Sequence, residues 1–560
     1  MVTHLPPAAS YPPNLAWDAP LNLGPLTTLL DDATARYPTR TAVAFMGVTL
    51  TYTQVTTRVE ALAHTLTSLG LGKGDTIALC LPNCPTAVVA YYAILRIGAV
   101  VVNTNPLYTA TELGDILHDS AAKAIITTNL KVSLPKLLPH VGHGALQHLV
   151  LVDFTTELPW HLGLLFRLFK RSQLATVPHH SNIHRYNPSA SSTPSTNTQS
   201  HTSSIKDLAV LQYTGGTTGT PKAAMLTHGA LMANVRQIQL WLGDTPPEGD
   251  RTLAILPLFH CFAMTAGMNL TFANGGTLHL LPQFNLAHVL KTLDKQRITL
   301  LPGVPTLFNA ILNASKLNPA GFSHLRYGIS GGAPLPPEVK DKFEALTNSR
   351  LMEGYGLTEA SPVVCCNPRH KRGKNSSAGL PIPGTHVGIF NPETLQPLPL
   401  SEVGEVWVSG PQLMQGYLNN PTATQACMMQ HKGLTWLRSG DLGFLDDEGY
   451  LHLTDRLKDI ILVNGYNVYP RVIEDCLYTH PNVAEAMVIG LPDPQRGETP
   501  HAYVVLKTDA KATEDDLMLF CRKHLNPLER PVQVVLRQSL PKTQVGKLSK
   551  KDLKAEVLGQ

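Results

Sequence analysis

The sequence predicts an α/β fold, with a large multi-layer N-terminal domain of mainly parallel sheets followed by a small α+β C-terminal domain. The chain has 560 residues, which is too long for one hydrophobic core. Residues 26–151 alternate helical spacings of apolar residues with short apolar runs, as parallel strands covered by helices do. Residues 460–560 read as a separate unit of short strands and helices. We therefore place the two domains at residues 1–454 and 460–560.

Individual elements follow from the spacing of the apolar residues. In the N-terminal part we expect helices over 26–35 and 55–69, and strands over 76–81 and 124–127. In the C-terminal part we expect a helix that begins near Pro470, a helix capped by Thr513, and strands over 485–489, 502–506 and 532–536. The most apolar long window, 256–281, is interrupted by polar residues and glycines, so it is interpreted as buried core with a pocket wall.

The stretch 211–228 carries the strongest local signal for ligand binding. Its glycines let backbone N–H groups approach a phosphate chain, its threonines add hydroxyl donors, and Thr227 is placed to cap the helix that follows. A polar surface turn is the alternative, but a turn needs only one or two glycines. The stretch is not a P-loop, because Lys222 follows a proline and precedes Ala223. The candidate phosphate-binding residues are Thr214, Gly215, Gly216, Thr217, Thr218, Gly219 and Lys222.

Two later loops, 327–335 and 351–359, also follow apolar runs and combine glycine with polar residues, as ligand loops at the carboxyl edge of a parallel sheet do. A third piece, 437–443 with 454–459, comes after them. Their candidate cofactor-binding residues are Gly331, Gly332 and Ala333 in the first, Tyr355, Gly356, Thr358 and Glu359 in the second, and Asp441 and Arg456 in the third. Tyr355 offers a flat face for a base, Thr358 a hydroxyl for phosphate, and Glu359 a carboxylate for Mg²⁺. Asp441 can accept both hydroxyls of a ribose, although on local grounds it is a turn residue beside Gly440.

Two single residues have ordinary explanations on local grounds. His260 ends the strand-like run 255–260, and a lone histidine is usually structural. Lys547 lies near a basic tail, where a lysine is normally a solvated charge.

Composition excludes several classes of protein. The net charge of +4 is close to neutral for this length and gives nucleic-acid binding no support. Eight scattered cysteines lack zinc-like spacing and favour reduced thiols in a cytoplasmic enzyme. Residues 1–20 lack the basic start and apolar core of a signal peptide. The sequence does not define an oligomeric state.

Two segments differ in composition from the rest. Residues 158–174 combine bulky apolar side chains with Arg167, Lys170 and Arg171. Such a helix either lies on an anionic membrane, which would make the protein peripheral on its inner face, or packs against its own domain. Residues 188–204 are rich in Ser, Thr and Asn and are interpreted as a mobile surface loop.

Three strings resemble the adenylate-forming (AMP-binding) superfamily, most closely its bacterial long-chain fatty acid–CoA ligases. They are Tyr-Thr-Gly-Gly-Thr-Thr-Gly at 213–219, Glu-Gly-Tyr-Gly-Leu-Thr-Glu at 353–359 and Pro-Lys-Thr-Gln-Val-Gly-Lys at 541–547. Similarity extends over about residues 26–553, apart from 188–204, and Ala223 stands where the family usually has Gly. The resemblance implies that Lys547 is the catalytic lysine, that residues 455–459 form a hinge around Lys458, and that Gly465 and Tyr466 face a CoA channel. It also implies that His260 is a gate or wall beside the acyl and nucleotide sites rather than a catalytic base.

A ligase of this kind uses ATP, Mg²⁺ and CoA. It activates a fatty acid as acyl-AMP with release of pyrophosphate, and a rotation of the C-terminal domain then allows CoA to form the thioester. A medium-chain or aryl acid is an alternative substrate. A luciferase-like oxygenase would share the motifs, whereas a peptide-synthetase module would carry an Asp near 259–263. From a different class, an inactive nucleotide- or lipid-binding scaffold is the alternative.

Overall fold

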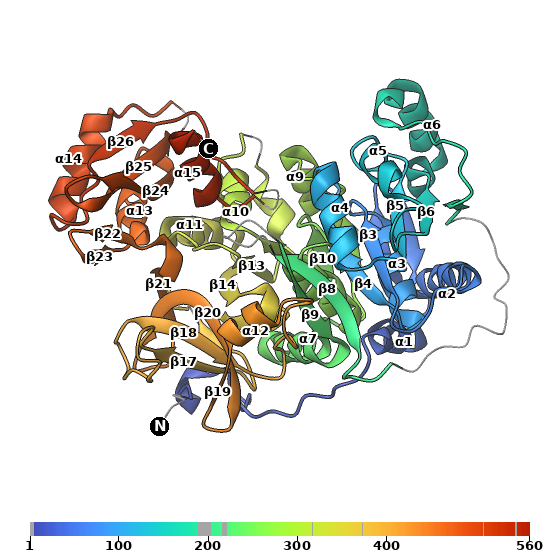
Figure 1. Cartoon of the computed structure of the whole chain (residues 1–560), viewed down its shortest axis with the longest axis horizontal. Coiled ribbons are helices and arrows are strands. Elements are labelled where there is room, and N and C mark those ends of the chain that lie inside the picture. The colour runs from blue at the N-terminus through green and yellow to red at the C-terminus, as the bar shows by residue number, and fades with distance from the viewer. Residues whose placement is uncertain are drawn as a thin grey trace.

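The computed structural model describes residues 5–188, 203–214, 221–315, 317–371, 373–507, 509–543 and 546–559. They form four sheets, three in a large domain and one in a smaller lobe that Figure 1 shows in orange and red beside it. Most of the expected loop at 188–204 and residues 215–220 of the phosphate-binding stretch lie outside the described residues.

A seven-stranded sheet forms from the first part of the chain. Every neighbouring pair in it is parallel except β8 and β9, which join as an antiparallel pair around residues 215–220. In spatial order its strands are β7 (Ile183–Tyr186), β6 (His148–Val152), β5 (Ala124–Thr128), β3 (Thr76–Cys80), β4 (Val100–Asn103), β8 (Leu208–Thr214) and β9 (Lys222–Thr227).

A nine-stranded sheet forms the second layer of the large domain. Its six central strands are parallel, and the strands at its two ends are antiparallel to their neighbours. In spatial order they are β16 (Leu380–Pro381), β15 (Val363–Cys366), β14 (Arg350–Gly356), β13 (Tyr327–Gly331), β12 (Leu300–Gly303), β10 (Arg251–Ala254), β11 (Thr277–Leu280), β1 (Thr41–Phe45) and β2 (Val48–Thr51). The carboxyl ends of β13 and β14 therefore bring two of the predicted ligand loops side by side.

The third sheet is antiparallel, and it belongs to the large domain. Its strands are β17 (His386–Phe390), β18 (Gly404–Ser409), β20 (Leu434–Leu445), β19 (Met428–His431) and β21 (Leu451–Arg456). The smaller lobe has its own sheet of β23 (Tyr466–Val468), β22 (Ile461–Val463), β25 (Gly497–Leu506), β24 (Val483–Asp493) and β26 (Gln533–Leu536). The structure thus confirms the predicted fold class of parallel layers with a small α+β domain.

The helices cover the sheets and agree with the predicted elements to within a few residues. The main ones are α1 (Thr27–Arg36), α2 (Tyr52–Ser68), α3 (Pro85–Arg96), α4 (Ala110–Asp119), α5 (Leu134–Leu137), α6 (Trp160–Phe169), α7 (His228–Leu242), α8 (Leu270–Ala273), α9 (Leu286–Gln296), α10 (Pro305–Leu312), α11 (Pro337–Thr347), α12 (Pro421–Cys427), α13 (Pro470–Tyr478), α14 (Glu514–His524) and α15 (Lys550–Leu558). Thr227 caps α7 by accepting from the Ala230 N–H, and Thr513 forms a capping box with Asp516 before α14, as predicted. Within the described ranges, no helix is long and apolar enough to cross a membrane.

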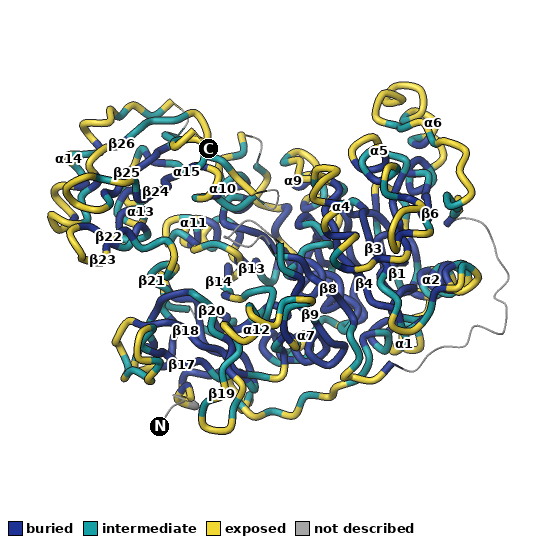
Figure 2. The backbone as a smooth tube through the Cα atoms, in the orientation of Figure 1, coloured by how far each residue is buried: buried dark blue, intermediate teal, exposed yellow. Residues whose placement is uncertain are grey.

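The main core lies where the two parallel sheets and their helices meet, and Figure 2 shows it in dark blue around β3, β4 and β8. An N-terminal segment, residues 5–26, runs along the outside of the large domain to α1 (Figure 1). The Trp17 indole N–H donates to the Thr385 carbonyl over 2.9 Å, and the Tyr11 ring packs edge-on against Trp241 at 5.2 Å between centroids. This segment therefore ties the start of the chain to the third sheet. All eight cysteines are free.

Candidate active site

The Lys547 side chain reaches from the smaller lobe into the large domain and lies directly over Gly332. Gly332 has a φ of +81°, and a Cβ placed there would lie 2.7 Å from the Lys547 Nζ, closer than real Cβ contacts come. The loop is held in place by the Thr306 hydroxyl, which donates to the Gly546 carbonyl over 3.1 Å. Glycine at 332 thus leaves the space that the lysine occupies, so the first predicted loop and the terminal motif meet.

Burial and neighbouring charge set the protonation of this region. The pKa of Lys547 is lowered to about 8, mainly by burial and then by the positive charge of Arg456. Burial also lowers the pKa of His260 to about 3, and the Lys547 charge adds to this effect. The His260 imidazole is therefore neutral near pH 7 and a weak base, which fits a pocket wall better than a proton acceptor.

Asp441 contacts both Tyr355 and Arg456, two other residues that the sequence predicts to bind the nucleotide. The Tyr355 hydroxyl donates to Asp441 Oδ2 over 2.6 Å, and Arg456 Nε lies 3.1 Å from Asp441 Oδ1. The local structure explains this arrangement, because Asp441 on β20 and Arg456 on β21 are directly opposite each other, while Tyr355 is near the end of β14. A carboxylate has about four lone-pair positions, so Asp441 keeps acceptor capacity for a ribose.

Glu359 and Lys222 meet at a tyrosine that sequence reasoning missed. The Tyr417 hydroxyl donates to Glu359 Oε1 over 2.8 Å, and Lys222 Nζ lies 5.5 Å from the centre of the Tyr417 ring. Tyr417 reaches this position because its segment pairs with β9, where the Met225 N–H donates to the Gly416 carbonyl. No motif marks Tyr417, since its role depends on pairing across nearly two hundred residues of chain.

The remaining residues of the predicted phosphate-binding stretch are placed only in part. Thr214 and Lys222 are paired at the ends of β8 and β9, and the Thr214 hydroxyl donates to the Lys222 carbonyl over 3.3 Å. The residues between them, Gly215, Gly216, Thr217, Thr218 and Gly219, lie outside the described residues. Thr358 and Glu359 begin the short helix η7 (Thr358–Ala360), directly after β14.

Some predicted glycines have a packing reason. A Cβ at Gly356 would collide with the carbonyl of Pro362, and a Cβ at Gly331 would lie 3.3 Å from the Phe262 ring. Ala333 follows Gly332 in the same loop and is half-buried. These positions therefore shape the loop even without a ligand.

The structure does not bring the predicted CoA-channel residues to this site. Gly465 lies in the turn between β22 and β23, and Tyr466, the first residue of β23, is 64% exposed. Figure 1 places these two strands at the outer side of the smaller lobe, away from β8 and β9. Lys458, the predicted hinge residue, lies in the short helix η8 (Leu457–Asp459) directly after β21 and is exposed.

Glu359 can contribute a carboxylate ligand to Mg²⁺, but the protein does not supply a full coordination sphere. No group of three or more His, Cys, Asp or Glu residues that could hold a metal occurs in the described part of the chain. This fits Mg²⁺, which is usually held by one or two carboxylates together with substrate phosphates and water.

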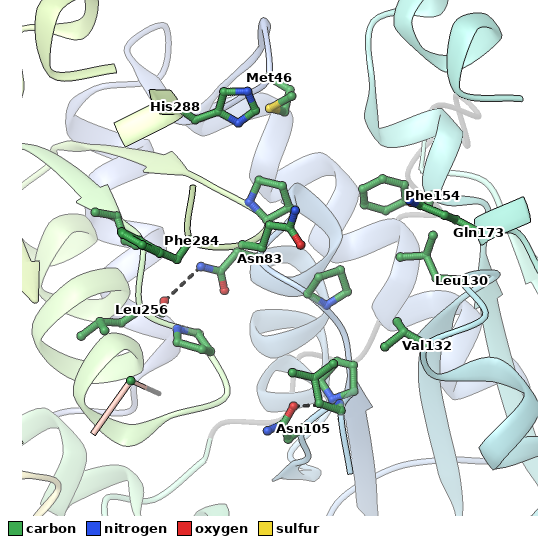
Figure 3. Close-up of a pocket in the computed structure, with 18 of the residues that line it drawn as sticks. Met46, Asn83, Asn105, Leu130, Val132, Phe154, Gln173, Leu256, Phe284 and His288 are labelled. Atoms are coloured by element: carbon green, nitrogen blue, oxygen red, sulfur yellow. Dashed lines mark hydrogen bonds between the residues drawn. The ribbon is translucent and has the colours of Figure 1, made fainter. Parts of the chain in front are cut away.

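A cavity of about 1450 Å³ extends from this site across the large domain. Thr306, Gly546 and Phe259 line its inner end, and side chains of α6 line its outer end. Figure 3 shows Phe284 and Leu256 on one side of it and Leu130 and Val132 on the other. The Asn83 amide, which also lines it, donates to the carbonyl of Leu256 over 3.0 Å and accepts from the Leu258 N–H, so its polar groups are satisfied by backbone. The cavity is therefore suited to an apolar ligand.

Comparison with protein families gives two matches that together span both domains. A family model described as "AMP-binding enzyme" matches residues 30–418, and one described as "AMP-binding enzyme C-terminal domain" matches residues 472–547. The chain is 39% identical to a long-chain-fatty-acid–CoA ligase of Bacillus subtilis, over 99% of each chain. It is 37% identical to a protein of the same name from Salmonella typhimurium, over 97% of each chain.

Among solved structures, the ATP-bound form of MatB from Rhodopseudomonas palustris is similar, with a TM-score of 0.79 and 26% identity. The match covers 95% of this chain and all of that one. The apo form of the same protein gives a lower TM-score of 0.71. The overall shape of this chain is thus closer to the ATP-bound form.

Proposed function

The chain belongs to the family of AMP-binding enzymes, and from that premise we propose that it joins a long-chain fatty acid to CoA. The fatty carboxylate attacks the α-phosphate of ATP, giving acyl-AMP and pyrophosphate. The CoA thiol then attacks the acyl carbon, and AMP leaves with the carboxyl oxygen through which it was attached. The observation that carries the proposal is the Lys547 ammonium held over Gly332, beside the Tyr355–Asp441–Arg456 group.

In the first step, negative charge builds up between the attacking carboxylate and the phosphate oxygens. We infer that Lys547 supplies a positive charge there, and that its low-polarity surroundings strengthen the interaction. Asp441 and Arg456 would hold the ribose, Tyr355 the base, and Thr358 a phosphate oxygen. Mg²⁺, held by Glu359 and by the phosphates of ATP, would neutralise further charge. No side chain acts as a nucleophile.

In the second step, Lys547 would occupy the approach that the thiol needs. We infer that the smaller lobe turns about residues 455–459, which withdraws Lys547 and brings Gly465 and Tyr466 to the site. The exposure of Tyr466 in this structure supports the inference. A residue that lines the CoA channel is needed only for thioester formation, so it has no partner in the adenylation arrangement.

The acid is inferred to be long-chain because the cavity exceeds the usual 300–1,000 Å³ of small-ligand sites. AMP release with CoA, compared for octanoate, palmitate, oleate and aryl acids, tests this. A preference for palmitate or oleate is expected, and a preference for an aryl acid would replace the substrate assignment.

The roles of the two domains are tested by measuring the half-reactions separately. Lys547→Ala should abolish carboxylate-dependent ATP–pyrophosphate exchange and leave thioester formation from supplied acyl-AMP largely intact. Lys551→Ala, a nearby exposed lysine, is the matched control and should change neither. Equal loss of both half-reactions in Lys547→Ala would remove the assignment, and no exchange in the wild type would support a binding scaffold instead.

We also infer that residues 158–174 contact a membrane surface. Support comes from Trp160 and Phe169, which are 81% and 80% exposed, and from Lys170 and Arg171, which are exposed beside them. Flotation of the protein with vesicles that contain an anionic lipid should carry it upward, and flotation with neutral vesicles should carry less of it.

A further inference from the structure

The helix α6 has apolar side chains on two different faces. Trp160, Leu164 and Leu168 follow one another at spacings of four, and they are 81%, 52% and 65% exposed. Leu162, Leu165, Phe166 and Phe169 occupy another stripe and line the outer end of the cavity. A helix that is apolar on both faces is usually buried, in a core or in lipid. Figure 2 shows α6 largely in yellow at a corner of the molecule, so its outer stripe is covered by no other part of the described chain.

A third stripe fixes the orientation of α6. Gly163 packs so closely on the loop before it that a Cβ would lie 2.6 Å from the Thr155 carbonyl oxygen. One turn later, Arg167 forms an ion pair with Asp153 over 2.7 Å, and its Nε donates to the Thr155 hydroxyl over 2.9 Å. The helix therefore cannot rotate to bury its outer stripe without breaking these contacts.

Charge at the end of α6 matches an anionic lipid surface. Lys170 and Arg171 follow the helix directly and are exposed, and neither forms an ion pair within the described residues. Lys170 also lines the mouth of the cavity, as does Lys131. Free cations beside an exposed apolar stripe are typical of helices that lie in a membrane interface.

We propose that α6 is a port between a lipid bilayer and the cavity. Its outer stripe enters the surface of a membrane that carries anionic head groups, and its inner stripe guides a fatty acid from that surface toward Lys547. The proposal rests on the proposed function, since it concerns how the acid reaches the site. The same continuous cavity touches α6 at one end and Thr306 and Gly546 at the other, so an acyl chain can pass along it from α6 toward the site.

The experiment compares two ways of presenting the acid to the full-length protein. Palmitate is supplied within vesicles of phosphatidylcholine and phosphatidylglycerol, and octanoate is supplied free in water; AMP release with CoA is measured for each. The variant is Leu164→Glu with Leu168→Glu, which leaves the cavity lining unchanged. The matched control is Leu519→Glu, on the exposed face of α14 in the smaller lobe and equally 52% exposed.

The double variant is expected to lose about tenfold in vesicle binding and about fivefold or more in turnover of vesicle-borne palmitate, with octanoate turnover within about twofold of wild type. Leu519→Glu should match the wild type in all three.

Unchanged vesicle binding, or equal losses with both acids, would overturn the port. A wild-type dimer that the substitutions dissociate, without vesicle binding, would overturn it too and assign the stripe to a second copy. If the wild type uses neither acid, the proposed function itself fails; if it uses both and only the port prediction fails, the proposed function stands.

Discussion

The position of Lys547 depends on a residue without a side chain. Gly332 leaves room for the lysine, and its φ of +81° is one that other residues adopt only with strain. The ammonium is correspondingly desolvated, so the group that we propose supplies positive charge to the reaction is also one whose charge burial disfavours. Geometry at 332 and protonation at 547 are therefore linked.

Gly332→Ala tests the geometric part of this link. We expect the adenylation half-reaction to fall by about a hundredfold, because the methyl group displaces the lysine end, while thioester formation from supplied acyl-AMP falls much less. Gly70→Ala is a matched control, since Gly70 has a φ of +80° but no atom within 4 Å of its Cβ position. Similar effects of the two substitutions would attribute the loss to backbone strain alone. Pyrophosphate exchange and single-turnover thioester assays provide both rates.

The pH dependence of adenylation tests the electrostatic part. In the proposed mechanism the charged form of Lys547 is the active one. Its pKa is lowered to about 8, so kcat/KM for adenylation should fall by about tenfold per pH unit above that value. Below it the lysine is protonated and the rate should not depend on this group. In Lys547→Arg the guanidinium stays charged at alkaline pH, so the kcat/KM of any residual activity should no longer decrease above about pH 8. A fall that persists unchanged in that variant would assign it to another group.

At the scale of elements, the segment between the domains is short, and its first two residues contact both domains. Asp455 accepts from the Arg471 N–H at the start of α13 over 2.8 Å, and Arg456 is paired with Asp441 of the large domain. Directly after Asp455 and Arg456 comes η8, one short turn in which Lys458 is exposed. A rotation of the smaller lobe would concentrate its backbone changes here.

Lys458→Pro should separate the two half-reactions at this turn. The φ of a 3₁₀ turn is close to the one that proline imposes, so adenylation should be retained within a few-fold, whereas a fixed φ should slow thioester formation by about tenfold or more. Lys458→Ala removes the side chain but keeps the backbone free, and it should retain both rates. If the alanine variant loses thioester formation equally, the side chain rather than the backbone rotation is responsible.

At the scale of the whole molecule, the two domains are held together in this arrangement by weak contacts. Besides the Thr306–Gly546 hydrogen bond, Lys507 lies 3.7 Å from Glu338 across the interface, with exposed fractions of 35% and 48%. Exposed ion pairs contribute about 0–1 kcal/mol. Contacts this weak are compatible with the proposed rotation of the smaller lobe.

Reversal of this ion pair tests whether it biases the domain arrangement. Lys507→Glu replaces attraction with repulsion, so adenylation should slow by about two- to fivefold with thioester formation unchanged or faster. The combined Glu338→Lys and Lys507→Glu variant restores opposite charges and should recover the rate. If the combined variant does not recover the rate even at low salt, the pair has no role in domain docking, because exposed charges interact most strongly at low salt.

Much of the fold was predictable because its signals are local. The caps at Thr227 and Thr513, and the rhythm of apolar runs in the first part of the chain, depend on residues a few positions apart. The glycine and polar loops 327–335 and 353–359 could be placed together because parallel strands end at one edge.

The rest depends on contacts between distant segments. Tyr417 reaches Glu359 only through pairing of its segment with β9, and no motif next to Tyr417 in the sequence indicates this contact. The cavity is bounded by side chains of both domains, so its size is a property of the packed molecule. The two interpretations of residues 158–174 likewise differed only in which face of α6 is covered, and periodicity alone does not decide that.

The contact between Trp17 and Thr385 also bears on how the chain is made. The two residues are 368 positions apart, and synthesis adds about 5–20 residues per second, so roughly 20 to 75 s separate their emergence from the ribosome. The seven strands from β3 to β9 are complete by residue 227 and can pair during that interval. The aromatic side chains of the N-terminal segment stay uncovered until the segment around Thr385 has been synthesised. It is the part of the nascent chain that we expect chaperones to hold longest.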